Sequence, residues 1–406
     1  MIRLFINGLA ASAGAGLTYL RNVVPHLARR SDAETTVLLN PAMRREFGEL
    51  PHVSFVEDPG SYSAARRFIY EQTMVPRLVR RSGAQILISA GNFALWKSPV
   101  PQILLSGNSL YTSIDFIHDV RARRDYKIWA DTLVKSWFAR RSISWADVTV
   151  APSEAFAQVL TQWSGRQVVS VHHGFDLDVF TSDSTPLPCA AQEQIGQGKD
   201  ALRLLFVSHY NYYRNFETLF RAMPILSERL NGRKVKLFLT CRLNSRENPG
   251  SYRAEAASAL VHDLRDSESI VELGTIHYRA LHHLYRTCHI YVTPAYTETF
   301  AHPLVEAMSS GLPVVASDLP VHREICGDAA LYFPRFSAEA LAEQVLQIHG
   351  SAELSENLAR NGLQRARDFS WSEHVERIVV LAKDLAKVPA KKLVRPGIDR
   401  NSSGLH

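Results

Sequence analysis

The sequence predicts an α/β protein of two domains, each built on a doubly wound parallel sheet, with the two sheets facing a central cleft. Three observations predict this class. Short apolar runs of strand length alternate with longer segments of helical periodicity. The runs are aliphatic and β-branched without polar alternation, as in strands buried on both faces of a parallel sheet. The series occurs twice within 406 residues, a length that suits two domains.

The expected strands form two sets of six, one in each half of the chain. In the first half they are residues 3–6, 36–39, 53–56, 85–89, 102–105 and 148–151. In the second half they are residues 203–207, 235–240, 269–273, 290–293, 313–316 and 329–333. Segments with apolar residues at helical steps separate them, such as residues 215–230. Ligands of open α/β sheets bind outside the carboxyl ends of the strands, so a site is expected where strands lead into helices.

Residues 181–200 form the expected boundary between the domains, because this polar segment is rich in Pro, Gly and Gln and has no strand or helix period. The division gives an N-terminal domain at 1–180 and a C-terminal domain at 201–386, whose last helix is expected to pack back on the N-terminal domain. Residues 387–406 are basic and polar, which predicts a disordered tail.

Composition excludes several classes of protein. Apolar residues make up 46% of the chain and charged residues 21%, which excludes a disordered or fibrous protein. No run of about 18 apolar residues is present, so no membrane-spanning helix is expected. The four cysteines lie far apart, which predicts neither a disulfide scaffold nor a cysteine metal site and suits a reducing cytoplasm. An N-terminal export signal is disfavoured because Asn7-Gly8 breaks the apolar run and helical spacing follows.

The basic charge is concentrated in one segment. Residues 1–180 carry 20 Lys and Arg against 15 Asp and Glu, and the rest of the chain carries 26 against 25. Seven basic and two acidic residues lie in Arg121–Arg141, interleaved with aromatic residues. This segment is either a core helix or a face that contacts anionic lipid or a lipid-linked substrate. Nucleic acid is not an expected partner, because no binding motif surrounds these charges.

The most informative segment is residues 291–318, where a strand leads through a loop into a helix. Glu298 lies in the loop, Pro303 suits the first turn of the helix, and Glu306 is expected in that same turn. The backbone N–H groups of Thr299 to His302 are then free at a helix N-terminus, which predicts an anion site. The two carboxylates could bind hydroxyls on either side of a bound phosphate. Alternatively, Glu306 only stabilises the helix dipole.

This segment resembles the signature of the retaining, GT-B-fold glycosyltransferases of family 4, E-G-F-G-x-P-x-x-E-A-M-x-x-G-x-P-V-V-A-S. The matching positions are Glu298, Phe300, Pro303, Glu306, Ala307, Met308, Gly311, Pro313 and 314–317. Other family motifs are matched over nearly the whole chain, at Ala146-Asp147, 151–153, 173–176, Gly274 and 369–371. The resemblance implies the GT-B architecture, in which two Rossmann-like domains face a central cleft, and a nucleoside-diphosphate sugar as donor.

The resemblance also implies roles for individual residues. Glu298 binds hydroxyls of the transferred sugar near the reacting centre, and Glu306 holds the two ribose hydroxyls of the nucleotide. Arg214 stands where the family has a lysine and neutralises the pyrophosphate. His209 replaces the family's arginine, so either it is protonated beside the phosphates or Arg214 and the helix N-terminus carry the charge.

Backbone positions complete the donor site that the resemblance implies. Two signature glycines are replaced by Thr299 and Ala301, so the approach of the backbone to the sugar is expected to be more restricted. The nucleotide base contacts the backbone near Gly274 and Ile276. The expected donor-binding residues of the signature loop are Thr299, Phe300, Ala301 and His302.

Gly14 and Gly16 follow the first strand and precede a helix. They either let the backbone approach the donor phosphates or form a plain tight turn. A dinucleotide fingerprint is incomplete here, because Tyr19 is nearest to the third glycine position and the second strand ends in Asn40 rather than an acid. Asn108 is the most suitable replacement for a histidine with which many family members contact the sugar.

No metal or cofactor is expected. Asp176 and Asp178 resemble a metal-binding Asp-x-Asp pair, but they lie in a loop that matches a family motif. The pairs His172-His173 and His282-His283 lack ligand spacing and are interpreted as ordinary polar residues.

We therefore predict a cytoplasmic glycosyltransferase that moves a hexose from a nucleoside-diphosphate sugar to a hydroxyl of a glycan or lipid-linked acceptor. By general likeness, the setting is bacterial surface polysaccharide or lipopolysaccharide synthesis, with peripheral contact between Arg121–Arg141 and the inner face of the plasma membrane. A sugar-nucleotide epimerase of the same fold is an alternative. So is a non-catalytic sugar-nucleotide-binding partner in a glycan-assembly complex, because His209 and the altered glycines depart from the family.

Overall fold

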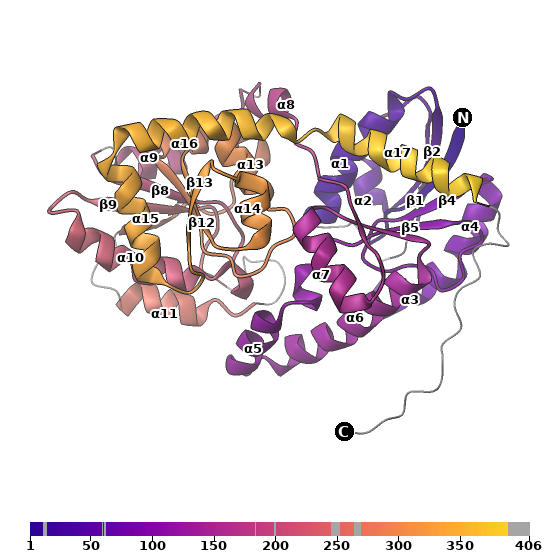
Figure 1. Ribbon diagram of the computed structural model, residues 1–406, viewed down its shortest axis with the longest axis horizontal. Helices are drawn as coiled ribbons and strands as arrows, with labels where there is room; N and C mark the ends of the chain where they lie inside the picture. Colours follow the sequence, from indigo (N-terminus) through magenta and orange to yellow (C-terminus); the bar gives the residue numbers. More distant parts are fainter. Residues whose placement is uncertain are drawn as a thin grey trace. The chain divides into compact units, whose positions relative to one another are not determined.

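The computed structural model describes residues 1–10, 14–58, 60, 62–182, 184–198, 200–244, 252–263 and 269–388 (Figure 1). These residues form two compact units. The first unit consists of Met1–Ser106, Ala139–Val150 and the chain from Val375, and the second consists of Gly107–Phe138 and Ala151–His374. The expected tail lies outside the described residues from residue 389 onward.

The first sheet has seven strands in the order β3-β2-β1-β4-β5-β6-β7. The strands are β1 (Ile2–Asn7), β2 (Ala33–Leu39), β3 (Val53–Glu57), β4 (Ile86–Ser89), β5 (Gln102–Leu105), β6 (Val148–Ala151) and β7 (Val169–Ser170). Pairing from β1 to β6 is parallel throughout. All six strands predicted in this half are present. The seventh was not predicted, because two residues are too few to form a pattern.

The second sheet has six parallel strands in the order β10-β9-β8-β11-β12-β13. They are β8 (Leu202–Phe206), β9 (Val235–Leu239), β10 (Ile270–Glu272), β11 (Ile290–Thr293), β12 (Val314–Ser317) and β13 (Ala330–Phe333), which correspond to the six predicted runs. Strands β11 and β12 are buried at every position, as expected of strands covered on both faces. The strand order reverses between β8 and β11, so the carboxyl ends of these two strands flank the switch point of the sheet. The predicted α/β class with two doubly wound parallel sheets is confirmed.

The first unit has a core that includes Phe5, Leu38, Val79 and Leu87, and Val79 comes from a helix. The helices of this unit are α1 (Gly14–Ala28), α2 (Pro41–Arg44), α3 (Ala64–Thr73), α4 (Val75–Ser82), the end of α6 (Tyr126–Trp145) that follows Phe138 and the part of α17 (Trp371–Lys387) that follows His374. Within α17, the Lys383 ammonium lies 2.5 Å from the Asp32 carboxylate, so the last helix of the chain is tied to the first unit.

The second unit contains most of the remaining helices. They are α5 (Ile114–Ala122), the first part of α6 (Tyr126–Trp145), α7 (Glu154–Ser164), α8 (Leu177–Thr181), α9 (Cys189–Gly196), α10 (Phe216–Arg229), α11 (Glu255–Asp263), α12 (Leu281–Thr287), α13 (His302–Ser309), α14 (Pro320–Cys326), α15 (Ala338–Gly350) and α16 (Ala352–Arg365). Among the described residues, no helix is both long enough and apolar enough to cross a membrane.

The compact units differ from the division expected at 181–200. That segment was expected to have no helical period, but it contains α9, whose buried residues are only Ala191 and Ile195 and therefore leave a weak pattern. Helix α5 precedes the expected boundary, yet Phe116 and Val120 are fully buried in the core of the second unit. Periodicity predicts that a helix is amphipathic but does not predict which sheet its apolar face covers.

Candidate active site

The signature segment folds as a strand, a loop and a helix, as the sequence predicts. The chain leaves β11 at Thr293 and enters α13 at His302, with Pro303 in the first turn. Glu306 is the fifth residue of the helix, so the expectation that it lies in the first turn was wrong. Because dipole stabilisation falls off within the first turn, its position argues against the interpretation that Glu306 serves only the helix dipole.

Arg214 and Glu298 form a direct ion pair in the second unit. The Arg214 Nη1 group donates a hydrogen bond to Oε1 of Glu298, and both side chains are largely buried. The other carboxylate oxygen, Oε2, accepts the backbone N–H of Thr299 at 3.0 Å. Burial lowers the pKa of Arg214, but the charge of Glu298, its hydrogen bond and the nearby Tyr213 and Tyr291 together more than offset this effect, so the net shift is upward and the guanidinium stays charged. The structure thus brings together two residues that the sequence assigned to the same site.

Glu306 is buried and held by a tyrosine. The hydroxyl of Tyr285, on α12, donates to Oε2 of Glu306 at 2.8 Å. Burial raises the pKa of Glu306 from 4.5 to about 7, although the hydrogen bond from Tyr285 acts in the opposite direction. Sequence reasoning missed Tyr285, because its spacing with Leu281 and Leu284 is that of an ordinary buried helix face.

The loop before α13 presents free backbone donors. The N–H groups of Phe300, Ala301 and His302 have no acceptor among the described residues, whereas the N–H of Thr299 is used by Glu298. Three of the four expected N–H groups therefore remain available at the N-terminus of α13. Unpaired N–H groups at such a terminus, together with the helix dipole, favour a bound anion.

Ala301 has left-handed backbone geometry, with φ at 64° and ψ at 64°. This is the position at which the family signature has a glycine. An L-residue with a Cβ is disfavoured there by about 1–2 kcal/mol, so the loop keeps the conformation that glycine would supply but at a cost in stability.

His209 lies in the loop after β8, and its surroundings disfavour the positive charge that the family's arginine would carry at this position. Desolvation lowers its pKa, and the positive charge of Arg214 lowers it further. The neutral imidazole is therefore favoured in this structure. Of the two alternatives for this site, the geometry supports the one in which Arg214 and the helix N-terminus carry the charge.

Gly274 and Ile276 lie in the loop that follows β10. Gly274 has a left-handed φ of 78°, and a Cβ there would lie 3.3 Å from Nε of Arg242. Ile276 is buried. Tyr278 follows two residues later, and its pKa is raised first by burial and then by the charges of Glu306 and Asp176. Tyr278 therefore lies near enough to Glu306 for the two side chains to interact electrostatically, and the roles expected for Gly274 and Ile276 stay predictions.

In the described part of the chain, the Asn108 side chain makes no hydrogen bond to this cluster. The Asn108 side chain caps the short helix at Ser109–Tyr111 by accepting the N–H of Leu110 at 3.0 Å. Gly14 and Gly16 lie in the first turn of α1, in the other compact unit. The roles expected for these three residues stay predictions.

The histidines set aside in the sequence include ring partners of the signature loop. His173 lies 5.5 Å from Phe300 and 5.3 Å from His302, measured between ring centroids. Burial lowers the pKa of His302 and of His374 to about 4 each, so their rings are neutral at physiological pH. Within the described part of the chain, no group of three or more His, Cys, Asp and Glu side chains is arranged to hold a metal ion.

Two family descriptions match the chain in succession. Residues 17–179 match Glycosyltransferase Family 4, and residues 190–365 match Glycosyl transferases group 1. The O-antigen chain mannosyltransferase B of Escherichia coli is 34% identical over 99 residues, which are 24% of this chain and 26% of that protein. Two D-inositol 3-phosphate glycosyltransferases, from Corynebacterium aurimucosum and Catenulispora acidiphila, are matched over 49% and 53% of their lengths. The chain therefore spans about half or less of the length of these curated relatives.

Solved structures share the fold over almost the whole chain. Sucrose-phosphate synthase from Thermosynechococcus elongatus has a TM-score of 0.73 at 17% identity, covering 95% of this chain and 99% of that one. Anabaena HepE, in complex with UDP and glucose, has a TM-score of 0.68 at 15% identity, covering 95% and 100%. The fold and the signature site together define a glycosyltransferase of the GT-B class. The chain belongs to glycosyltransferase family 4.

Proposed function

We propose that this protein transfers a hexose from a nucleoside-diphosphate sugar to a hydroxyl group of a glycan or lipid-linked acceptor, with retention at the anomeric carbon. One observation carries the proposal. The segment from Glu298 to Glu306 supplies two carboxylates and the three free N–H groups of Phe300 to His302. Charged Arg214, from the loop after β8, pairs with Glu298 in this segment. Structures of Anabaena HepE with UDP and with UDP-glucose support a donor of this class.

The chemistry needs positive potential where the diphosphate leaves. The bond between the anomeric carbon and the β-phosphate oxygen breaks, and the developing negative charge is stabilised by Arg214 and the N–H groups. The acceptor oxygen forms the new bond on the same face, and its proton passes to the departing phosphate. We propose that this arrangement works without a metal or other cofactor.

Glu298 and Glu306 act on the two ends of the donor in this proposal. Glu298, already aligned by Arg214, binds hydroxyls of the transferred sugar. Glu306 accepts hydrogen bonds from the ribose hydroxyls through its carboxylate, while Tyr285 keeps one oxygen in place.

The proposal extends to the pathway in which the protein acts and to its contact with a membrane. The match to an O-antigen chain mannosyltransferase supports a role in bacterial surface polysaccharide or lipopolysaccharide synthesis. We also propose peripheral contact with an anionic membrane through Arg121–Arg141, on the cytoplasmic side. Trp129 packs on the core of the second unit, whereas Tyr126, Val134 and Trp137 are exposed, so the segment is partly core and partly an accessible apolar face.

Thermal-shift measurements with UDP-, GDP-, dTDP- and ADP-sugars test the donor class, because a ligand that binds only the folded state raises the melting temperature. At least one of these donors should stabilise the protein, and turnover should require an acceptor. Formation of an epimer from the donor alone would instead indicate the epimerase, and binding without turnover on any acceptor would indicate a non-catalytic partner. No stabilisation by any sugar nucleotide would contradict the proposal.

A further inference from the structure

The signature loop is anchored by a side chain from a distant part of the chain. Ser153, immediately before α7, donates its hydroxyl hydrogen to the carbonyl oxygen of Thr299 at 2.7 Å. No cis peptide bond occurs among the described residues, so the peptide between Thr299 and Phe300 is trans. In a trans peptide the C=O and the next N–H point in opposite directions. Fixing the Thr299 carbonyl therefore fixes the direction of the Phe300 N–H, the first free donor of the loop.

Ser153 has no freedom to turn away from Thr299. Its side chain is fully buried, and its oxygen also accepts the N–H of Phe156 at 3.2 Å as the cap of α7. The hydroxyl has one hydrogen to donate, and with the oxygen acting as acceptor for the helix that hydrogen goes to Thr299. Another rotamer would leave both the carbonyl and the helix N–H without this partner.

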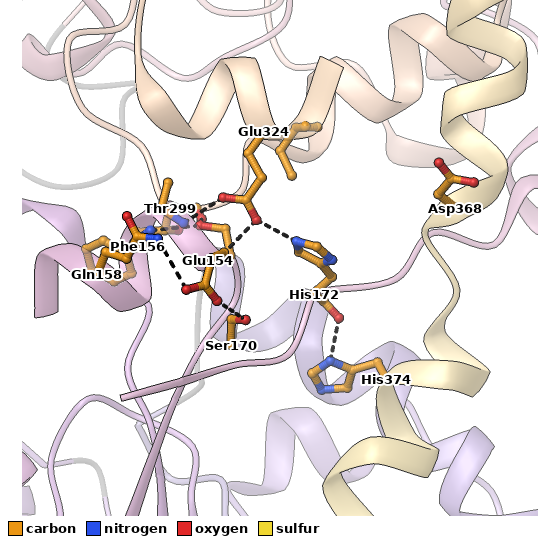
Figure 2. A network of polar contacts seen from close by, with 12 residues as sticks. Glu154, Phe156, Gln158, Ser170, His172, Thr299, Glu324, Asp368 and His374 are labelled. Atoms are coloured by element: carbon orange, nitrogen blue, oxygen red, sulfur yellow. Dashed lines mark hydrogen bonds and ion pairs between the residues drawn. The ribbon is translucent and has the colours of Figure 1, made fainter. Parts of the chain in front are cut away.

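Helix α7 is itself fixed at the same end. The Glu324 carboxylate, from α14, accepts the N–H groups of Glu154 at 2.7 Å and Ala155 at 2.6 Å (Figure 2). His172 Nε2 lies 2.5 Å from the same carboxylate. Burial acts to raise the pKa of Glu324, but these contacts lower it more, so the carboxylate stays ionised. Ser153 is thus presented by a helix whose first three N–H groups all have partners.

The geometry points to Ser153 as a positioning residue for the donor diphosphate: through the Thr299 carbonyl it aims the Phe300 N–H at the site where the phosphates lie. Glu324 supports this arrangement by holding the start of α7. The inference rests on the proposed function, because the aimed N–H matters only if an anion binds there.

Two substitutions separate this role from simple capping of α7. Both Ser153→Gly and Ser153→Ala remove the hydrogen bond to Thr299. Glycine is nearly as good as serine at a helix N-cap and alanine is much worse, so Ser153→Ala should lower the melting temperature markedly and Ser153→Gly only slightly. Ser351→Ala is a matched control, because Ser351 caps α16 by accepting the N–H of Leu354 and does not touch the signature loop.

The measurement is the dissociation constant, by calorimetry, for whichever of UDP, GDP, ADP and dTDP binds the wild-type protein most tightly. Both Ser153 variants should bind it about tenfold more weakly, which is the scale of one charge-assisted hydrogen bond, and Ser351→Ala should bind it as the wild type does. If Ser153→Gly binds as tightly as the wild type, or if affinity simply follows melting temperature across the three variants, the inference is overturned. Failure of the wild-type protein to bind any of the four nucleotides would overturn the proposed function itself, and the inference with it.

Discussion

Tyr285 donates a hydrogen bond of 2.8 Å to a carboxylate oxygen of Glu306, and both side chains are buried in the second unit. The contact fixes the carboxylate, but it does not compensate fully for the loss of water. As a result the proton affinity of Glu306 is raised into the neutral range. Glu306 is therefore expected to make both stability and donor binding depend on pH.

The first prediction concerns the free energy of unfolding of Glu306→Gln. The pKa of Glu306 is raised from 4.5 to about 7 on folding, so its favourable contribution is complete below pH 4.5 and is lost as the pH rises to about 7. The glutamine side chain of the variant does not ionise, so the variant does not lose stability in this way as the pH rises. The variant should gain stability relative to the wild type between pH 5 and pH 8, by at most about 3 kcal/mol. Urea denaturation at both pH values measures the difference, and a pH-independent difference would contradict the prediction.

Glu71 supplies a matched control in the first unit. Burial raises its pKa to about 7 as well, while Arg67 and Asn7 act in the opposite direction. Glu71→Gln should show the same gain in stability with pH. Only Glu306→Gln should also weaken donor binding, because Glu71 is not part of the proposed donor site.

The second prediction separates the two signature carboxylates by steady-state kinetics with the donor identified by thermal shift. In the proposed donor site, Glu306→Ala removes hydrogen bonds to the ribose that form equally in the ground and transition states, so it should raise the donor KM by about 10- to 100-fold with a smaller effect on kcat. Glu298→Ala removes the group that we propose lies beside the reacting centre, and it should lower kcat by about 100-fold or more. Small and equal effects in the two variants would show that these roles are misassigned.

The third prediction concerns backbone strain at Ala301. Because this residue has φ at 64°, Ala301→Gly relieves a conformation that glycine adopts freely. The substitution should raise the free energy of unfolding by about 1 kcal/mol, since the greater flexibility of glycine in the unfolded chain offsets part of the relief. Chemical denaturation measures the change. A loss of stability would mean that the Ala301 methyl group contributes more by packing than its backbone conformation costs.

The fourth prediction tests the exposed face of α6. Trp137 and Val134 are 54% and 57% exposed, and basic residues surround them in sequence. The double variant Trp137→Ser, Val134→Ser should lose most of its sedimentation with vesicles containing anionic phosphatidylglycerol, and binding should weaken as salt is raised. Val380→Ser, on the exposed face of α17, should sediment as the wild type does. Equal sedimentation of all three proteins, or none by the wild type, would argue against a membrane contact.

The sequence predicted the strands because their signal is local. Each of the twelve predicted runs became a strand, since continuous aliphatic residues have few other stable places in an α/β protein. Strand β7 was missed because two residues carry no period, and α9 because only Ala191 and Ile195 face the core. The sequence did not predict which sheet each helix packs against. The helix at Ile114–Ala122 is an example, because its apolar residues pack into the core of the second unit.

For the candidate site, too, the sequence predicted individual residues but not the contacts between them. Motif positions identified Glu298, Glu306 and Arg214, but not that Glu298 and Arg214 pair directly across 84 positions of sequence. Tyr285 and Ser153 act through single hydrogen bonds that depend on tertiary distance, and neither residue type is distinctive by itself. The departure at His209 was visible in the sequence, whereas its preference for the neutral form depends on its burial first and on the position of Arg214 second, which only the structure gives.

The chain passes from one compact unit to the other four times, at residues 106/107, 138/139, 150/151 and 374/375. A gene fragment that begins at residue 201 would therefore encode a half-molecule without Phe116 and Val120, leaving an open hydrophobic groove where α5 belongs. Such a fragment should aggregate when expressed alone. Co-expression with residues 1–200 should restore it to solution, as in a split-protein complementation pair.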